Sequence, residues 1–168
     1  MALKADRHEL DVDISFFMNE TAEKGCVVCI STAGSGAAMD QAGALVIKKI
    51  AHASTSIPVG VLLNDVVSLD LTRQHINWHQ DEVQKGGKVS ILKKGYVVTD
   101  KITGVPTAGA LAFMDDADTG NFAVAGSLDD TEYNAVGRFM SILDEDGYAK
   151  VEVNLPVPMA PTAGGVQV

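Results

Sequence analysis

The chain has 168 residues, a length that suits one domain or one domain with an arm. Hydrophobic residues make up 46% of it and aromatic residues 5%, which excludes a disordered protein and predicts a core of Val, Ile, Leu and Ala. The formal net charge of −9 argues against nucleic-acid binding, because nonspecific affinity for phosphates depends on Lys and Arg. No apolar run approaches the roughly 18 residues of a membrane span, so we expect no membrane partner either.

The N-terminal segment Met1–Asp13 has alternating charges and few apolar residues. We predict an arm that is loose in the free protein, although an ordinary frayed terminus explains the same pattern. The segment lacks the hydrophobic stretch of a secretory signal, so we expect synthesis in a cytoplasm, where Cys26 and Cys29 stay free thiols.

The first half of the chain contains short apolar runs. After the run Ile14–Met18, the β-branched stretch Gly25–Thr32 predicts a strand, and Ala33–Gly36 predicts a loop. The segment Ala37–Ala53 also fits a helical stripe, but its β-branched residues favour a strand over Ala44–His52.

The middle of the chain alternates between apolar and polar stretches. Ile57–Leu71 predicts a strand, a kink or turn at Asn64-Asp65, and a second short strand. Thr72–Lys85 is polar and predicts a loop. Two strands are then expected at Lys88–Leu92 and Gly95–Lys101, with Lys93-Lys94 between them.

The strand pattern continues to the end of the predicted body. Further strands are expected at Ala108–Met114, Phe122–Ala125, Ala135–Leu143 and Tyr148–Leu155, with turns or loops at Gly104–Thr107, Asp115–Asn121 and Asp144–Gly147. The last strand alternates apolar and polar residues, and Asp144 is suited to cap the turn before it. Thr131–Leu143 also fits a helix, but Gly137 lies in its middle and favours the strand.

The C-terminal segment Pro156–Val168 holds three of the five prolines and predicts an extended tail. Together, these predicted elements indicate a mostly-β fold, which is a small antiparallel β-barrel, β-tulip-like or sandwich domain. Residues 1–13 form the extended N-terminal arm, 14–155 the β-rich body, and 156–168 the Pro/Gly-rich tail.

Two motifs resemble metal or redox sites but lack the full pattern. Cys26 and Cys29 form a lone CxxC inside an apolar β-run, where positions i and i+3 point to opposite faces. We interpret them as two buried structural cysteines. The acidic loop from Asp115 fails the calcium-loop pattern, because its third and twelfth positions are Ala117 and Gly126.

His75 and His79 are spaced four apart and would share one face of a helix. The zincin pattern fails because no Glu follows the first His. Trp78 is the only Trp, and we interpret Arg73, His75, Trp78 and His79 as a contact patch, since Trp and Arg are enriched at interfaces. We predict no catalytic residues, no cofactor and no bound metal.

A resemblance to a known family rests on the stretches Gly87–Asp100, Ile102–Gly109, Val136–Ser141 and Asp144–Val151. Their order of strands and glycine turns, across roughly Ile57 to Leu155, resembles the capsid decoration (cement) proteins of tailed bacteriophages. The sequence departs from that family after Gly109, where Ala110 replaces the expected acidic residue.

This resemblance implies a β-barrel or β-tulip-like body, usually trimeric, placed over local three-fold positions of an icosahedral shell. We therefore expect a virion structural protein, not an enzyme, that binds the outside of the phage head and stabilises the lattice of the major capsid protein. An N-terminal arm supplies part of the grip in such proteins. The expected contacts to the capsid or to other partners are Leu3, Lys4, Arg7, His8, Leu10, Arg73, His75, Trp78 and His79.

Two other functions fit the same pattern. One is another virion part, such as a tail-tube, head–tail joining or fibre-base protein. The other is a small β-barrel enzyme or ligand-binding module that holds a metal through His75 and His79, with Asp81 or Glu82 nearby.

Overall fold

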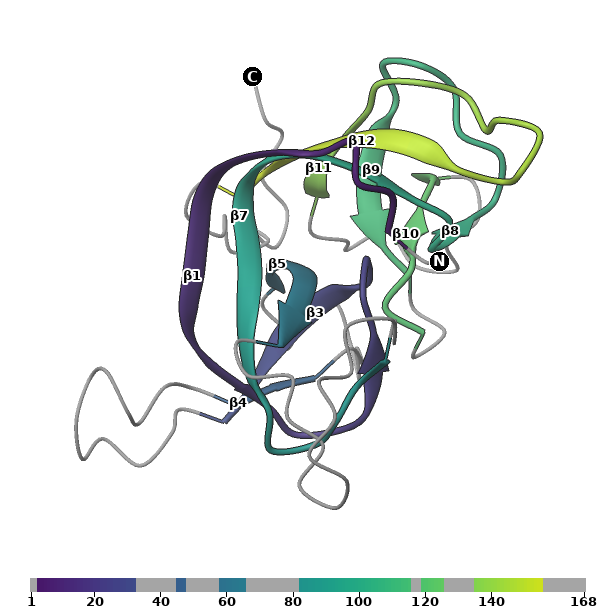
Figure 1. Cartoon of the computed structure of the whole chain (residues 1–168). Helices are drawn as coiled ribbons and strands as arrows, with labels where there is room; N and C mark the ends of the chain where they lie inside the picture. Colours follow the sequence, from purple (N-terminus) through teal and green to yellow (C-terminus); the bar gives the residue numbers. More distant parts are fainter. Residues whose placement is uncertain are drawn as a thin grey trace, which may run out of the picture.

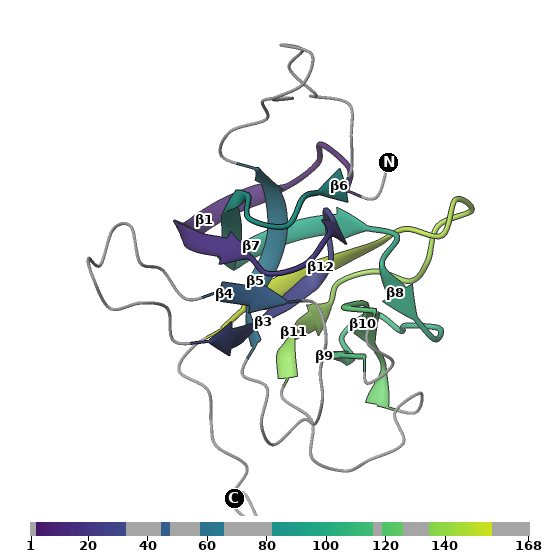
Figure 2. The ribbon, with the colours of Figure 1, turned by 90° about the horizontal axis from the view of Figure 1, so that it is seen from below.

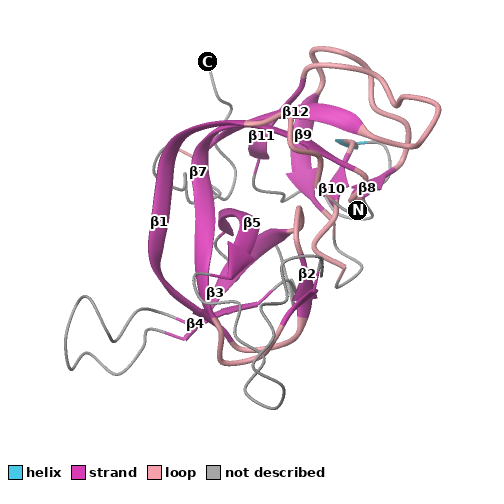
Figure 3. Cartoon of the chain, viewed as in Figure 1, coloured by secondary structure: helices cyan, strands magenta, loops and turns pink. Residues whose placement is uncertain are grey.

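The computed structural model describes residues 3–32, 45–47, 58–65, 82–115, 119–125 and 135–155. These residues form strands and the turns between them, which confirms the predicted mostly-β fold (Figures 1 and 3). No helix in this part of the chain is long and apolar enough to cross a membrane. The strands are β1 (His8–Met18), β2 (Ala22–Glu23), β3 (Val27–Thr32), β4 (Leu45–Ile47), β5 (Pro58–Asp65), β6 (Glu82–Val83), β7 (Lys88–Thr99), β8 (Ile102–Thr103), β9 (Leu111–Met114), β10 (Phe122–Ala123), β11 (Ala135–Phe139) and β12 (Ala149–Asn154).

Ten of these strands form one curled sheet in the order β1-β4-β3-β5-β7-β12-β11-β9-β10-β8. Strand β1 also pairs antiparallel with β7, so β1, β4, β3, β5 and β7 close into a ring of paired strands. The other five strands continue from β7 as an open, curled half (Figure 2). Closure of a sheet removes free edges, and the open half ends in a strand of only two residues.

The core lies on both faces of the central strands. Val61 of β5 packs in a large cluster that extends over β9, β10, β11 and β12, whereas its neighbour Leu62 packs in a second cluster with β2 and β6. Strands β3 and β7 divide their side chains between the two clusters in the same way. A strand that is buried on both faces reads as a continuous apolar run, which explains the sequence around Val27 and Val61.

Several predicted elements are confirmed. Strand β3 lies within Gly25–Thr32, and β4 lies within Ala44–His52. Residues Ala135–Phe139 form a strand, as predicted in preference to a helix. Strand β12 buries Ala149, Val151 and Val153 on alternate positions. The segments 33–44, 48–57, 66–81, 126–134 and 156–168, which include the second half of Ile57–Leu71 and the tail, lie outside the described residues.

The predicted break at Lys93-Lys94 is wrong, because β7 is one strand of 12 residues. Lys93 forms an ion pair with Asp13 of β1 at 2.5 Å, and Lys94 is exposed. The backbone at Lys94 pairs with Asp11 on one side and Asn154 on the other. Two successive charges therefore continue the strand, because one has a partner on β1 and the other lies in solvent.

The N-terminal segment also differs from a loose arm. His8–Asp13 form the first half of β1 and pair with β7, from His8 opposite Tyr96 to Asp13 opposite Ile91. Its alternating charges are compatible with this position, because β1 exposes most of its first half. The two-residue strands β2, β6 and β8 were not predicted, since pairs of residues carry no periodic pattern.

Candidate partner-contact surfaces

The first two residues of the described chain are held by the protein's own sheet. Leu3 is 6% exposed, belongs to the larger core cluster and forms an isolated bridge with Thr99. The backbone N–H of Lys4 donates to Val98, and its ammonium donates to Asp144 at 2.8 Å. This hydrogen bond raises the pKa of Lys4 above its ordinary value. Leu3 and Lys4 therefore fix the segment in place.

The next predicted contact residues are closer to solvent. Arg7 pairs with Glu9 at 2.6 Å, and the His8 ring stacks on Tyr96 with 6.3 Å between ring centroids. Leu10 is 59% exposed, and Ile14 of the same strand is 52% exposed. Strand β1 therefore presents two large apolar side chains to solvent. Of the other predicted contacts, Arg73, His75, Trp78 and His79 lie outside the described residues.

Strand register forms a second surface that the sequence did not reveal. Directly paired residues of neighbouring strands point to the same face of a sheet. The pairings of β1, β7, β12, β11 and β9 therefore align one row of side chains across five strands, consisting of His8, Tyr96, Glu152, Arg138 and Leu111. These strands come from separate parts of the chain but lie side by side in the curled sheet (Figure 1).

Neighbours of this row extend it into a broad surface. The ammonium of Lys150 lies over the Tyr96 ring, 5.2 Å from its centroid. Met140 is 44% exposed and donates its N–H to the carbonyl of Lys150. Lys94 lies two residues before Tyr96 on the same strand and is exposed. We call this surface the Tyr96 face; its residues are Lys94, Tyr96, Leu111, Arg138, Met140, Lys150 and Glu152.

The Tyr96 face carries the opposite sign of charge from the chain as a whole. It has three cationic side chains and one carboxylate, whereas the chain has a formal net charge of −9. It also combines Tyr, Arg and Met, which are enriched in the centres of protein interfaces. The surface is thus suited to an acidic partner with some apolar area.

An acidic turn connects β11 and β12. The carboxylate of Asp144 accepts hydrogen bonds from the backbone N–H of Asp146 at 3.0 Å and of Tyr148 at 2.7 Å. The hydrogen bond from Lys4, together with these backbone bonds, lowers the pKa of Asp144, and Gly147 adopts a φ of 85°. The predicted capping role of Asp144 is confirmed. We call residues 144–147 the acidic turn.

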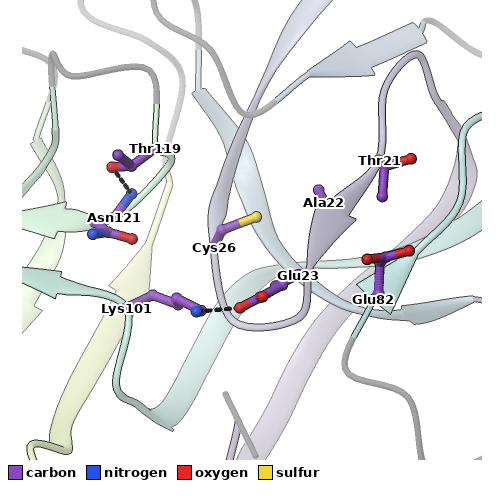
Figure 4. Close-up of a pocket in the computed structure, with 8 residues that line it drawn as sticks. All are labelled: Thr21, Ala22, Glu23, Cys26, Glu82, Lys101, Thr119 and Asn121. Atoms are coloured by element: carbon purple, nitrogen blue, oxygen red, sulfur yellow. Dashed lines mark hydrogen bonds and ion pairs between the residues drawn. The ribbon is translucent and has the colours of Figure 1, made fainter.

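A cavity of about 350 Å³ lies between the two-stranded sheet of β2 and β6 and the segments that follow β7. Figure 4 shows Lys101 paired with Glu23, with the Cys26 side chain above the pair in this view. Burial lowers the pKa of Lys101, but the hydrogen bond and charge of Glu23 outweigh this effect and raise it overall. The ion pair therefore joins β2 to the segment between β7 and β8. The cavity is lined by Thr21, Ala22, Glu23, Cys26, Glu82, Lys101, Thr119 and Asn121.

The two cysteines are buried, are not joined in a disulfide, and lie on opposite faces of the sheet. Cys26 belongs to one core cluster and Cys29 to the other, as the strand alternation predicted. Burial raises the pKa of Cys29 to about 12, and its sulfur lies 3.2 Å from the sulfur of Met114. A thiol with this pKa is protonated at neutral pH and acts as a small apolar side chain.

The start of the acidic loop is part of the interior. Asp115 is 2% exposed and accepts hydrogen bonds from Thr103 at 2.6 Å and Thr119 at 3.1 Å. Its carboxylate therefore ties β8 to the loop before β10. Within the described residues, no group of three or more His, Cys, Asp or Glu side chains is arranged to hold a metal ion.

The described residues define a mostly-β protein that presents apolar and charged side chains on the outside of its sheet. The sequence matches the family described as XM1 gp53 minor capsid protein over residues 5–155, and the chain belongs to this family. It is therefore a capsid-associated structural protein of a bacteriophage, located in the virion, which confirms the resemblance to phage head proteins. No curated protein matches the chain.

Proposed function

We propose that this protein is a decoration protein that binds the outside of the phage head and stabilises the lattice of the major capsid protein, without enzymatic activity. The observation that carries the proposal is the family match, because it covers the whole β-rich body and names a minor capsid protein. A minor capsid protein can stabilise a shell only through lasting contacts with the shell subunits. A sheet with few free edges provides a rigid base for such contacts.

We place the shell contact on β1 and the residues before it. Arg7, His8 and Leu10 lie there together with Ile14, and both apolar side chains are more than half exposed. Leu3 and Lys4 support the contact indirectly, because they hold the segment against β7. The predicted patch Arg73–His79 is the second part of the proposed contact.

The test uses particles that lack this protein. Purified protein is expected to cosediment with assembled shells but not with free capsid subunits, and to raise the temperature at which the shells disrupt. Leu10→Asp should abolish cosedimentation while its own unfolding temperature stays unchanged. Val105→Asp is the matched control, because Val105 is 78% exposed in the loop after β8 and should bind normally.

Two results would count against decoration of the head. Shells whose stability does not change on addition of the protein would exclude a stabilising role. Labelling of intact particles at a single vertex, in place of the whole head, would favour a head–tail joining protein.

A further inference from the structure

We propose that the acidic turn of one copy of this protein docks on the Tyr96 face of a second copy, so that the copies associate head to tail. The inference goes beyond attachment to the shell, because it concerns contacts between copies. It rests on two surfaces of opposite charge that the fold of a single chain leaves exposed.

The acidic turn has the shape of a docking element. Figures 1 and 2 both show the hairpin between β11 and β12 projecting from the body of the molecule. The hydrogen bonds to Asp144 hold its backbone in one conformation, while Glu145 and Asp146 are exposed. A turn that is already ordered loses little conformational freedom on binding, which favours association.

The Tyr96 face has unused binding capacity. Arg138 is exposed and lies directly opposite Glu152 in the β11–β12 pairing, yet within the described part of the chain it forms no ion pair. Leu111, opposite Arg138 on β9, is 49% exposed. A guanidinium flanked by exposed apolar side chains can bind a carboxylate and shield the contact from water.

Charge complementarity identifies the occupant as a second copy. The face is cationic on a chain with a formal net charge of −9, so another copy presents an acidic surface to it. The turn and the face are different surfaces of one chain. Contacts between two different surfaces are heterologous, and such contacts close into rings when the rotation between copies allows it.

The experiment measures the mass of the free protein by sedimentation, without shells, so its outcome is independent of shell binding. The wild type should form oligomers that weaken with added salt, since exposed charges are screened. Arg138→Glu alone and Glu145→Lys alone should each raise the dissociation constant about tenfold, because attraction becomes repulsion. The double variant Arg138→Glu, Glu145→Lys should restore association, because the pair is present again with exchanged signs.

Two variants control for general charge effects. Lys85→Glu changes an exposed cation in the turn before β7, and Asp6→Lys changes an exposed carboxylate outside the acidic turn. Both should associate like the wild type. Thermal unfolding checks that each variant folds, and Arg138→Ala and Glu145→Gln replace any reversal that does not fold.

The proposal is overturned by any of three results. The first is a wild type that stays monomeric at every concentration. The second is association that the reversals at Arg138 and Glu145 leave unchanged, or that the control variants weaken equally. The third is a double variant that associates no better than either single variant.

Discussion

Replacing Gly95 by alanine tests whether the close pairing of β1 with β7 holds the N-terminal segment in place. Gly95 adopts a φ of 148° and lies opposite Glu9 on β1. A Cβ atom at this position would overlap the backbone carbonyl oxygen of His8. Because both groups belong to the backbone, no change of side-chain rotamer relieves the overlap, and β1 itself must move.

The expected cost has two parts. A side chain at positive φ costs about 1–2 kcal/mol, and forced overlap in a packed structure adds typically about 1–3 kcal/mol. We therefore expect Gly95→Ala to lower the free energy of unfolding by about 3.5 kcal/mol, the middle of the summed range. Gly109→Ala is the matched control, because Gly109 has a φ of 91° and open space around its Cβ position. It should cost about 1.5 kcal/mol from the backbone alone.

Thermal and urea unfolding of both variants measure this difference. The two variants differ by about 2 kcal/mol, so at about 2–4 °C per kcal/mol for a chain of this size Gly95→Ala should melt roughly 4–8 °C below Gly109→Ala. Amide hydrogen exchange of the native protein should become faster along β1 in Gly95→Ala and stay unchanged in Gly109→Ala. Equal stability of the two variants would refute the argument that Gly95 is required by the approach of His8.

Three further predictions concern the interior and its charges. Burial raises the pKa of Asp13, but hydrogen bonds from Lys93 and Ser15 outweigh this effect and lower the pKa below 3.8. The ionised Asp13 therefore contributes its full stabilisation above pH 3.8, and this contribution is lost as the pH falls through the lowered pKa of the folded state. Asp13→Asn should therefore be less stable than the wild type by up to about 1 kcal/mol at neutral pH and equally stable in strong acid; a constant difference would contradict this. Both cysteines should resist a thiol reagent in the native protein and react in urea, and rapid native labelling would show that the core opens. Asp115→Ala should lower the free energy of unfolding by about 1–3 kcal/mol in urea titrations, because it removes a buried carboxylate that accepts hydrogen bonds from Thr103 and Thr119, and an unchanged midpoint would show that water replaces the carboxylate.

Much of the fold could be predicted because period-two alternation and turn chemistry are local. Strand β12 shows both, since its alternate residues are buried and Asp144 caps the turn before it. The strand at Ala135–Phe139 was distinguished from a helix by Gly137. The close approach of the Glu152 backbone leaves no room for a side chain there, which is a second reason for glycine at this position.

The errors arose where a partner far along the chain decides the local structure. Lys93 and Lys94 interrupt the apolar pattern, but pairing with β1 and β12 keeps β7 continuous. His8–Asp13 has the composition of a loose arm, yet β7 offers it a complete antiparallel partner. Propensity within a short window cannot identify such a partner, because β-structure depends on its neighbours more than on its own residues.

The same difference between local patterns and long-range pairing applies to the candidate surfaces. Leu10 and the acidic turn are visible in the sequence, since one is an apolar residue in a charged segment and the other is a run of carboxylates before glycine. The Tyr96 face is not visible, because Arg138 and Tyr96 are brought into one row only by two successive registers through Glu152.

Strand β7 connects the proposed shell contact on β1 with the Tyr96 face. Mutations can test the two contacts separately. Strand β7 pairs with β1, which carries Leu10, and it carries Tyr96, which lies opposite His8 of β1 and Glu152 of β12. Loosening β1 through Gly95→Ala acts on the first contact, whereas Arg138 and the acidic turn lie on β11 and the hairpin beyond it. Gly95→Ala should therefore weaken shell binding more than association between copies. An equal loss of both would mean that the sheet transmits the strain from β1 as far as β11.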